Sequence, residues 1–490
     1  MNLEKIKQEV KERGRRYYDV ESTGLKVYPN KPGGPVSDKT IRPLSIAMLQ
    51  EEEGVDCRTI LDETATLPDH MIAAPGALAT NGLKPSDFLG EQSQFTLAKA
   101  IHREFAKDLP IDHGYNNYNF DDQVLQHTFF ENLMDPWPRS RGNNVIIDVL
   151  KIVETVYCYA ETAINFPNDP LNLRQESICK VNGIETGKAH TAMDDTIALM
   201  NLVRLLEQNA PEIYYSAVQC GSKKRILHRL KNELFFCYGT LTRSKQREKI
   251  RKVCAFICQN PIGAMNNEIW FFNLLQDPTS YLSKQASELV KVIKNYKNPV
   301  FFKLKANRPP ILLDGADYCE QLDISSSEAM LRAEQINSNQ SFKAEFAKAL
   351  EMIGNPWADK AADFPDYPEE EIFNGFASEP DKALINYFQE AECSDRLRVY
   401  QHLDDPRLKH FAKRLIAIEH PNQCGQILKK DYAELCRFRL MSPSDAVPNL
   451  TLQGAMDMLD HKIAYGYDDE SMINEINKYM RDLETRVTST

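Results

Sequence analysis

The 490-residue chain lacks several features that would place it in a membrane or in an oxidising compartment. It contains no run of about eighteen apolar residues, which excludes a transmembrane helix. Its first residues are charged throughout and lack the apolar segment of a secretory signal. None of the 11 cysteines forms a C-x-x-C pair, and Cys254 and Cys258 have no second pair at zinc spacing. We therefore expect reduced, mostly buried thiols and a cytoplasmic protein.

Composition and charge describe a folded protein with a local basic region. The chain is 42% hydrophobic and 26% charged, and its length predicts more than one domain. The net charge of −11 argues against a general binder of polyanions, but residues 220–308 hold 18 Lys and Arg against 5 Asp and Glu. Such a block indicates a local anion-binding surface. The alternative is a solvated basic face without a ligand.

The pattern of apolar residues divides the chain into parts. Residues 1–14 predict a short polar helix outside the first domain, and residues 15–209 alternate strand and helix signals, as in a mixed α/β domain. Short apolar runs over 211–354 predict a small β-rich domain with helical insertions. Prolines and acids over 355–371 predict an exposed linker, and helical periodicity over 362–490 predicts a helix bundle. The predicted fold class is therefore multi-domain α/β.

A pair of carboxylates marks the first candidate site. Asp19 and Glu21 lie two residues apart in a strand predicted to begin at Tyr17, so both side chains point to one face. Two carboxylates on one face repel each other unless a proton or a cation lies between them, and a hard divalent cation with oxygen ligands is the usual solution. The D-x-E pattern alone is common and does not define a site.

Two further acidic motifs follow. Asp121 and Asp122 come after an asparagine-rich turn at the start of an apolar-periodic stretch, where an aspartate is often only a helix cap. His190 precedes a strongly amphipathic helix that has Asp194 and Asp195 in its first turns. Since five residues is not a same-face spacing, His190 can join Asp195 only from a loop folded back over the site. The alternative is a capped helix with an acidic first turn.

Together these motifs resemble the DEDDh exonuclease superfamily, which has a ribonuclease-H-like fold. DVESTGL is similar to the first motif of that family, NYNFDD to the second and AHTAMDD to the third. The resemblance assigns the five family positions to Asp19, Glu21, Asp121, His190 and Asp195.

A narrower resemblance is to bacterial exonuclease I. GYNNYNFDDQV, LRQESICKVNGIETGKAHTAMDD and FNGFASEPDKALI are each similar to stretches of that family, while the middle third matches loosely. This implies an exonuclease domain (15–209), an SH3-like domain with insertions (211–354) and a helical C-terminal domain (362–490) around single-stranded DNA. The implied activity is that of a 3′→5′ exodeoxyribonuclease, acting in DNA repair and recombination.

The resemblance also implies roles for the site residues. Two Mg²⁺ ions, which Mn²⁺ can replace, would be bridged by Asp19. Glu21 and Asp195 would hold the ion that carries the attacking water, and Asp121 would complete the other. His190 would be the general base. The products would be nucleoside 5′-monophosphates.

Substrate and partner contacts are also implied. Backbone near Ser22 and Leu25 would seat the terminal nucleotide, and Arg174 is a candidate phosphate contact. The aromatic runs Phe235–Tyr238 and Ile269–Phe272 are either stacking platforms for bases or strand core. Expected partners are single-stranded DNA and the acidic C-terminal tail of single-stranded-DNA-binding protein, with no membrane contact and a monomeric state.

Departures from the family and two alternatives remain open. Residues 28–41 form a longer loop, and the stretch NNVIID keeps Asp148 but lacks the family's Trp-Asp pair. The catalytic residues do not separate DNA from RNA, so an exoribonuclease is one alternative. A non-catalytic single-strand-binding protein is the other, although such a protein would be marked by a lost metal ligand and none is lost here.

Overall fold

The computed structural model describes most of the chain. It describes residues 3–24, 38–107, 109–140, 142–167, 171–187, 191–244, 247–295, 299–356, 367–464 and 466–489. No helix in these ranges is long and apolar enough to cross a membrane.

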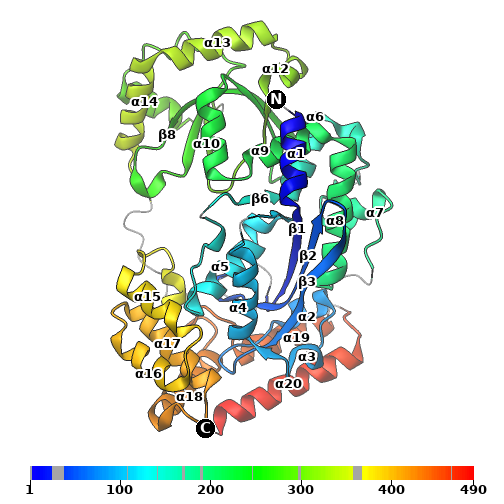
Figure 1. Cartoon of the computed structure of the whole chain (residues 1–490), viewed down its shortest axis with the longest axis vertical. Coiled ribbons are helices and arrows are strands. Elements are labelled where there is room, and N and C mark those ends of the chain that lie inside the picture. The colour runs from blue at the N-terminus through cyan, green and yellow to red at the C-terminus, as the bar shows by residue number, and fades with distance from the viewer. Residues whose placement is uncertain are drawn as a thin grey trace.

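A mixed six-stranded sheet with the order β4-β3-β2-β1-β5-β6 forms the middle of the molecule (Figure 1). Its strands are β1 (Arg15–Ser22), β2 (Pro43–Glu52), β3 (Val55–Thr66), β4 (Gln92–Ser93), β5 (Ile111–Gly114) and β6 (Val145–Asp148). The central strand β1 is antiparallel to β2 and parallel to β5. Because side chains alternate along a strand, Tyr17, Asp19 and Glu21 point to one face of β1, and Tyr18 and Val20 to the other.

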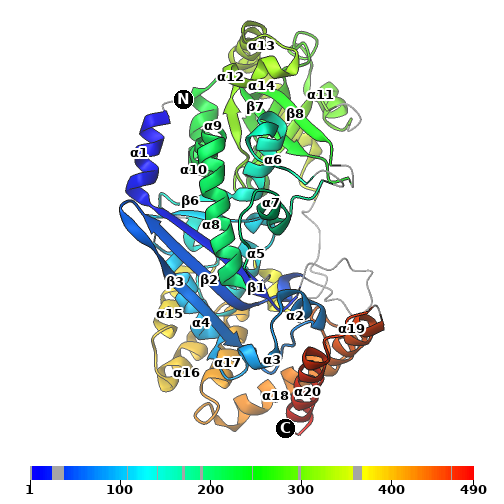
Figure 2. The same cartoon turned by 90° about the vertical axis from the view of Figure 1, so that its right-hand side faces the viewer.

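Helices cover both faces of this sheet. They are α1 (Leu3–Arg13), α2 (Pro75–Asn81), α3 (Pro85–Phe88), α4 (Gln94–Phe105), α5 (Asp121–Glu131), α6 (Val149–Tyr159), α7 (Gln175–Val181), α8 (Ala192–Asn209) and α9 (Pro211–Cys220). Tyr17 packs into a core that includes α8, whereas Tyr18 and Val20 pack with α4 and α5. Figure 2 shows α8 along one face of β1 and β2 and α4 on the opposite side. The alternation of β1 thus separates two apolar cores.

A second sheet lies above the first in Figure 1. It is antiparallel with the order β10-β9-β8-β7-β11. Its strands are β7 (Phe236–Leu241), β8 (Lys249–Gln259), β9 (Glu268–Asn273), β10 (Phe301–Lys305) and β11 (Leu312–Asp314). The helices around it are α10 (Lys223–Asn232), α11 (Ala286–Ile293), α12 (Gly315–Tyr318), α13 (Ser326–Ser338) and α14 (Gln340–Ile353).

The aromatic runs of the second sheet are core rather than stacking platforms. Phe236, Phe271 and Phe272 are fully buried, and Phe235 and Trp270 are nearly so. Strand residues whose side chains alternate between two covered faces bury both sets of rings. The interpretation of these runs as strand core is therefore correct, and the stacking alternative is wrong for the buried rings.

The C-terminal part is helical, as predicted. Its helices are α15 (Glu379–Phe388), α16 (Cys393–His402), α17 (Pro406–Glu419), α18 (Gly425–Met441), α19 (Leu452–Ala464) and α20 (Glu470–Thr488). The described single turns of 3-10 helix are η1 (Asp38–Thr40), η2 (Asn117–Asn119), η3 (Pro138–Ser140), η4 (Glu161–Ala163), η5 (Gly263–Met265), η6 (Cys319–Leu322) and η7 (Pro368–Glu371). Helices α15–α18 share a core with α4 and α5, and α18–α20 share another with α2 and α3. The predicted multi-domain α/β fold class is confirmed.

A buried cluster of charges joins this helical part to the first sheet. Glu369 of η7 accepts hydrogen bonds from Arg414 on α17 and from Arg439 on α18, the latter at 2.7 Å. Arg414 also donates to Glu131 on α5 at 2.9 Å, and Arg42 binds the same carboxylate. All five side chains are at most 5% exposed. The cluster therefore joins η7, α17 and α18 to the end of α5, through Glu131, and to the start of β2, through Arg42.

The prediction of an exposed linker over 355–371 is wrong at its C-terminal end. Residues 357–366 lie outside the described part, but Tyr367 is 2% and Glu369 1% exposed. The acidic sequence of η7 suggests solvent, yet buried arginines from distant helices compensate its charge.

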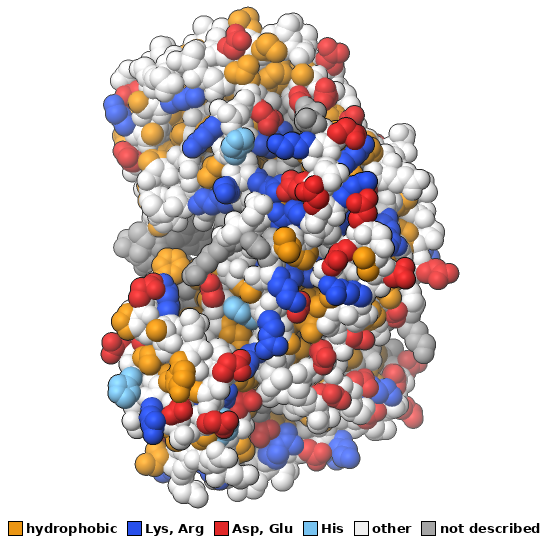
Figure 3. Space-filling model, viewed as in Figure 1, with side chains coloured by type: hydrophobic (Ala, Val, Ile, Leu, Met, Phe, Trp, Pro, Cys, Tyr) orange, Lys and Arg blue, Asp and Glu red, His pale blue; other side chains and the backbone are white. Residues whose placement is uncertain are grey.

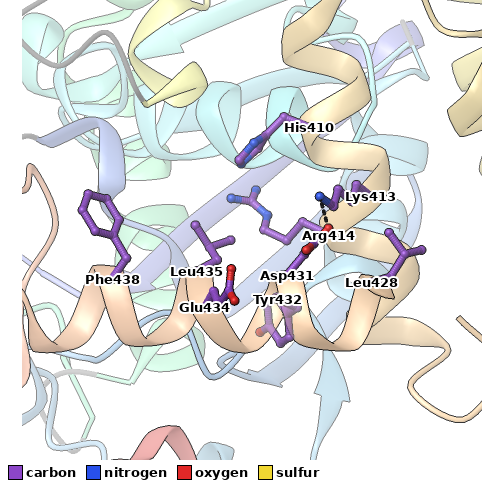
Figure 4. A pocket seen from close by; sticks show the side chains of 9 residues that line it. All are labelled: His410, Lys413, Arg414, Leu428, Asp431, Tyr432, Glu434, Leu435 and Phe438. Atoms are coloured by element: carbon purple, nitrogen blue, oxygen red, sulfur yellow. Dashed lines mark ion pairs between the residues drawn. The ribbon is translucent and has the colours of Figure 1, made fainter. Parts of the chain in front are cut away.

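A pocket of about 360 Å³ opens beside this cluster, between α17 and α18. Figure 4 shows His410 and Arg414 pointing into it and the ion pair of Lys413 with Asp431 at its side. Burial, together with the charge of Arg414, lowers the pKa of His410 to about 4, so its imidazole is neutral at pH 7.

Candidate active site

Three carboxylates predicted from two separate motifs meet at one place. Oxygens of Asp19, Glu21 and Asp195 all lie within 4.8 Å of one another, and the three side chains are partly exposed. In the described residues this is the one group of His, Cys, Asp or Glu side chains with the spacing of a metal site. The expected same-face geometry of the D-x-E pair and the approach of the third motif are both present.

Local structure explains how Asp195 reaches the strand. Thr191 caps α8 by accepting a hydrogen bond from the Asp194 N–H, which places Asp195 in the first turn. Gln175 at the start of α7 donates to the backbone carbonyl of Asp195 at 2.8 Å. Gly187 has φ +61°, and a Cβ there would lie 2.4 Å from the Asp194 side chain, so Asp194 packs against the glycine. The bond from Gln175 is a supporting contact that the sequence did not predict.

The electrostatics of the group favour a cation. Burial and then the charges of Glu21, Asp121 and Asp195 hold the pKa of Asp19 well above its usual range. Burial and the charges of Asp195 and Asp121 raise the pKa of Glu21 to about 8. The neighbouring charges that shift these two pKa values are all carboxylates. A divalent cation would relieve this repulsion, because it favours the ionised form of each ligand.

Asp121 stands beside this group in the first turn of α5. It is 5% exposed, and burial together with the charge of Asp122 raises its pKa to about 7. The turn before it is fixed, because Asn116 has φ +59° and its N–H donates to Asp148 at 2.8 Å. Asp148 also caps α6, which is a structural role for this retained family residue. Asp121 is thus presented toward Asp19 and Glu21, whose pKa values its charge raises.

The other predicted site residues divide into two sets. His190 and Leu25 lie outside the described residues, so their roles stay predictions. Ser22 is 2% exposed, and its hydroxyl donates to the Gly24 carbonyl at 2.8 Å. Arg174 is exposed at the residue before α7. The structure does not bring Arg174 into a hydrogen bond with the acidic group, and its contact with phosphate stays a prediction.

The basic block is only partly compensated by acids. Lys303 and Lys305 pair with Glu268, and Arg225 pairs with Glu9 of α1. Lys224, at the start of α10, is exposed. Figure 3 shows Lys and Arg side chains gathered around the position of α10, with Asp and Glu among them. Part of the block is therefore available to an anionic ligand.

Comparison with known proteins adds a family to this geometry. A family model described as Exonuclease matches residues 17–203. Exodeoxyribonuclease I of Escherichia coli is 30% identical over 151 residues, which cover 30% of this chain and 32% of that protein. Exodeoxyribonuclease I of Haemophilus influenzae is 24% identical over 434 residues, covering 82% of this chain and 87% of that protein. The first alignment thus spans about a third of its relative, and the second most of it.

Solved structures match along almost the whole chain. The structure of E. coli exonuclease I in complex with a dA16 oligonucleotide has a TM-score of 0.74 at 18% identity, covering 96% of this chain and 99% of that one. A structure described as an ExoI/SSB-Ct complex has a TM-score of 0.73 at 17% identity with the same coverage. At this identity the likeness establishes the fold.

The acidic group and almost all of the first sheet lie within residues 17–203, the part of the chain that matches the Exonuclease family model. The fold of the whole chain is that of solved structures of bacterial exonuclease I, and the resemblance to that protein predicted from the sequence is confirmed. The similarity to enzymes of the exodeoxyribonuclease I type that the sequence suggested is likewise found.

Proposed function

We propose that this chain is a metal-dependent 3′→5′ exonuclease that degrades single-stranded DNA to nucleoside 5′-monophosphates. The observation that carries the proposal is the meeting of Asp19, Glu21 and Asp195 within 4.8 Å on an exonuclease domain. No catalytic carboxylate of the family pattern has been replaced, which argues against the non-catalytic alternative.

The donor set fits a hard divalent cation. Asp19, Glu21 and Asp195 offer only carboxylate oxygens, which Mg²⁺ and Mn²⁺ prefer, and Asp121 adds a fourth. We propose that these residues hold two Mg²⁺ ions. When bound, such ions stabilise charge on phosphoryl oxygens and lower the pKa of water.

The residues of the chain would then carry the following roles in phosphodiester hydrolysis. Asp19, Glu21 and Asp195 would hold the cations, and the cations would in turn keep these carboxyl groups ionised. His190 accepts the proton of the attacking water, because its ordinary pKa near 6.5 suits transfer at neutral pH. Backbone around Ser22 holds the terminal nucleotide, and Arg174 contacts a phosphate.

The fold supports DNA as the substrate. The structural match to exonuclease I covers 96% of this chain, so it includes the helical part and the second sheet, and that solved relative is in complex with a dA16 oligonucleotide. A second solved relative supports an interaction with the C-terminal tail of single-stranded-DNA-binding protein. A role in DNA repair and a cytoplasmic location are part of the proposal.

The proposal is tested with an oligonucleotide labelled at its 5′ end. Incubation with the protein and Mg²⁺ should give a ladder of labelled products that shorten from the 3′ end, and EDTA should abolish it. Asp195→Asn should also abolish it, because the isosteric amide cannot supply the ligand charge. Asp194→Asn is the matched control and should lose far less activity, since Asp194 lies outside the acidic group.

A matched RNA strand separates the alternatives. Hydrolysis of RNA with the DNA strand left intact would replace the proposal with an exoribonuclease. Intact DNA and RNA with Mg²⁺ and with Mn²⁺ would support the binding-protein alternative.

A further inference from the structure

A second charged group lies behind β1, on the face opposite the catalytic carboxylates. It consists of Arg16 and Tyr18 of β1, Asp112 of β5, Asp122 of α5 and Arg139 of η3. Arg16 is 0%, Tyr18 1%, Asp112 1% and Asp122 5% exposed, and the Arg139 side chain is 9% exposed. Two guanidiniums thus balance two carboxylates in a nearly inaccessible place.

Hydrogen bonds connect this group through Arg139. Arg139 donates from Nη2 to Asp122 and from Nη1 to Asp112 at 3.2 Å and to Tyr18 Oη at 3.1 Å. Tyr18 Oη donates to the same Asp122 oxygen at 2.6 Å. Asn117 of η2 donates to Tyr18 Oη at 2.9 Å and to the other oxygen of Asp122 at 3.3 Å. The Asp122 carboxylate is therefore held from three sides.

The guanidinium of Arg139 is itself fixed. Its carbon lies 4.0 Å from the ring centroid of Phe105 and 5.2 Å from that of Tyr18. Burial acts to lower the pKa of Arg139, but the charges of Asp122 and Asp112 and the hydrogen bond to Tyr18 hold it well above its usual range. Arg139 is thus a rigid, permanently charged fork with a defined set of acceptors.

Adjacent side chains in the first turn of α5 point to the two groups. Asp122 enters the group behind β1. The Asp121 carboxylate accepts a hydrogen bond from the backbone of Val20, the residue between Asp19 and Glu21 on β1, and its charge acts on both. We propose that Arg139 is a positioning residue for the acidic site: by holding Asp122 it fixes the first turn of α5, and so the position of the Asp121 carboxylate. This inference rests on the proposed metal-dependent function.

The test measures metal binding as well as activity. Arg139→Met removes the fork and keeps an apolar stem over Phe105, and Arg139→Lys keeps the charge without the fork. Met and Lys are both smaller than Arg, so neither meets a steric conflict at this position, where Arg139 and Asp122 line a groove of about 400 Å³. Arg414→Met is the control, because Arg414 is another buried arginine, whose ion pairs are with Glu369 and with Glu131 at the far end of α5 and not with its first turn.

Mn²⁺ binding is followed by the electron paramagnetic resonance of the free ion, and hydrolysis with the 5′-labelled DNA strand. Loss of a partner behind a metal ligand typically weakens metal binding by about 10–100-fold. We expect a loss of about tenfold or more in Mn²⁺ affinity for Arg139→Met, a smaller loss for Arg139→Lys and none for Arg414→Met. The Mg²⁺ concentration for half-maximal hydrolysis should rise in the same order, with the KM for DNA changed less than kcat.

Wild-type Mn²⁺ affinity in a folded Arg139→Met protein would overturn the inference, as would an equal loss in Arg414→Met. If Arg139→Met does not fold, Asp122→Asn tests the same link, since it keeps the shape and removes the charged acceptor; unchanged Mn²⁺ affinity there would also overturn it. A wild-type protein that binds Mn²⁺ but hydrolyses neither strand would refute the proposed function and leave the positioning role of Arg139 standing. That role is decided by the Mn²⁺ affinities of the variants.

Discussion

Glu369→Gln should destabilise the protein by disturbing the buried charge cluster that joins the helical part to the first sheet. The carboxylate is 1% exposed and compensates Arg414 and Arg439, each 3% exposed. Without the charge of Glu369, Glu131 is the one carboxylate of the cluster that remains to balance three guanidiniums. These are the side chains of Arg42, Arg414 and Arg439. Removing one partner of a buried pair costs about 3–5 kcal/mol. Because glutamine keeps one acceptor oxygen, we expect a loss near the lower limit, about 3 kcal/mol.

The dependence on pH follows from the pKa of Glu369. Burial acts to raise this pKa, but the charges of Arg439 and Arg414 hold it well below its usual range. The stability contributed by a carboxylate with a depressed pKa is present above its unfolded pKa, about 4.3, and is lost as the pH falls toward the folded value. The gap between wild type and Glu369→Gln should therefore be constant from pH 5 to pH 8 and narrow in more acidic solution.

Urea unfolding at 25 °C measures the gap, with Glu379→Gln as the control. Glu379 makes an ion pair with Lys382 on the surface, and its side chain is 86% exposed, so its loss should change stability little. A Glu369→Gln protein no less stable than the control would refute the reasoning, and so would a gap that changes between pH 5 and pH 8.

Further expectations concern the metal, its supports and the surface. Mg²⁺ at a hundredfold excess over its Kd should raise the free energy of unfolding by about 2.7 kcal/mol and so raise the melting temperature. Asp19→Asn should remove this shift in a thermal melt. Gln175→Ala should cost about 0.5–1.5 kcal/mol in urea unfolding through the lost bond to the Asp195 carbonyl, and should lower kcat more than it raises KM. A lowered KM instead would contradict that role. Phe373→Ser and Phe376→Ser should each change stability by no more than about 0.5 kcal/mol, because the rings are 71% and 83% exposed; a larger loss would show burial that the structure lacks.

The sequence predicted the elements whose signals are local. Alternation around Asp19 and Glu21 predicted a strand, and the strand is β1, Arg15–Ser22. The short polar helix predicted over residues 1–14 is α1, Leu3–Arg13. The acidic group of Asp19, Glu21 and Asp195 followed from two motifs, since a family pattern fixes which distant residues must meet even where spacing alone does not. The expectation for His190 falls outside the described residues.

Contacts between distant charged residues gave no such signal. Glu369 lies 45 residues from Arg414 and 70 from Arg439, so an acid-rich, proline-rich stretch was interpreted as exposed. Arg139 likewise binds Asp112 and Asp122 through the fold and not through a local pattern. A charged side chain favours solvent by itself, and its burial depends on partners that composition does not reveal. The composition of the sequence revealed the basic block over 220–308, but it did not reveal which of these Lys and Arg side chains form ion pairs with acids.

The shared core of α4, α5 and α15–α18 has a practical consequence for protein engineering. A fragment ending before the acidic segment at 367 would expose the apolar side chains of α4 and α5 to water and leave Glu131 without Arg414. Such a fragment should aggregate rather than act as a minimal enzyme. Supplying residues 367–489 as a second chain would restore the missing surface, so the two pieces should reassemble without a covalent connection.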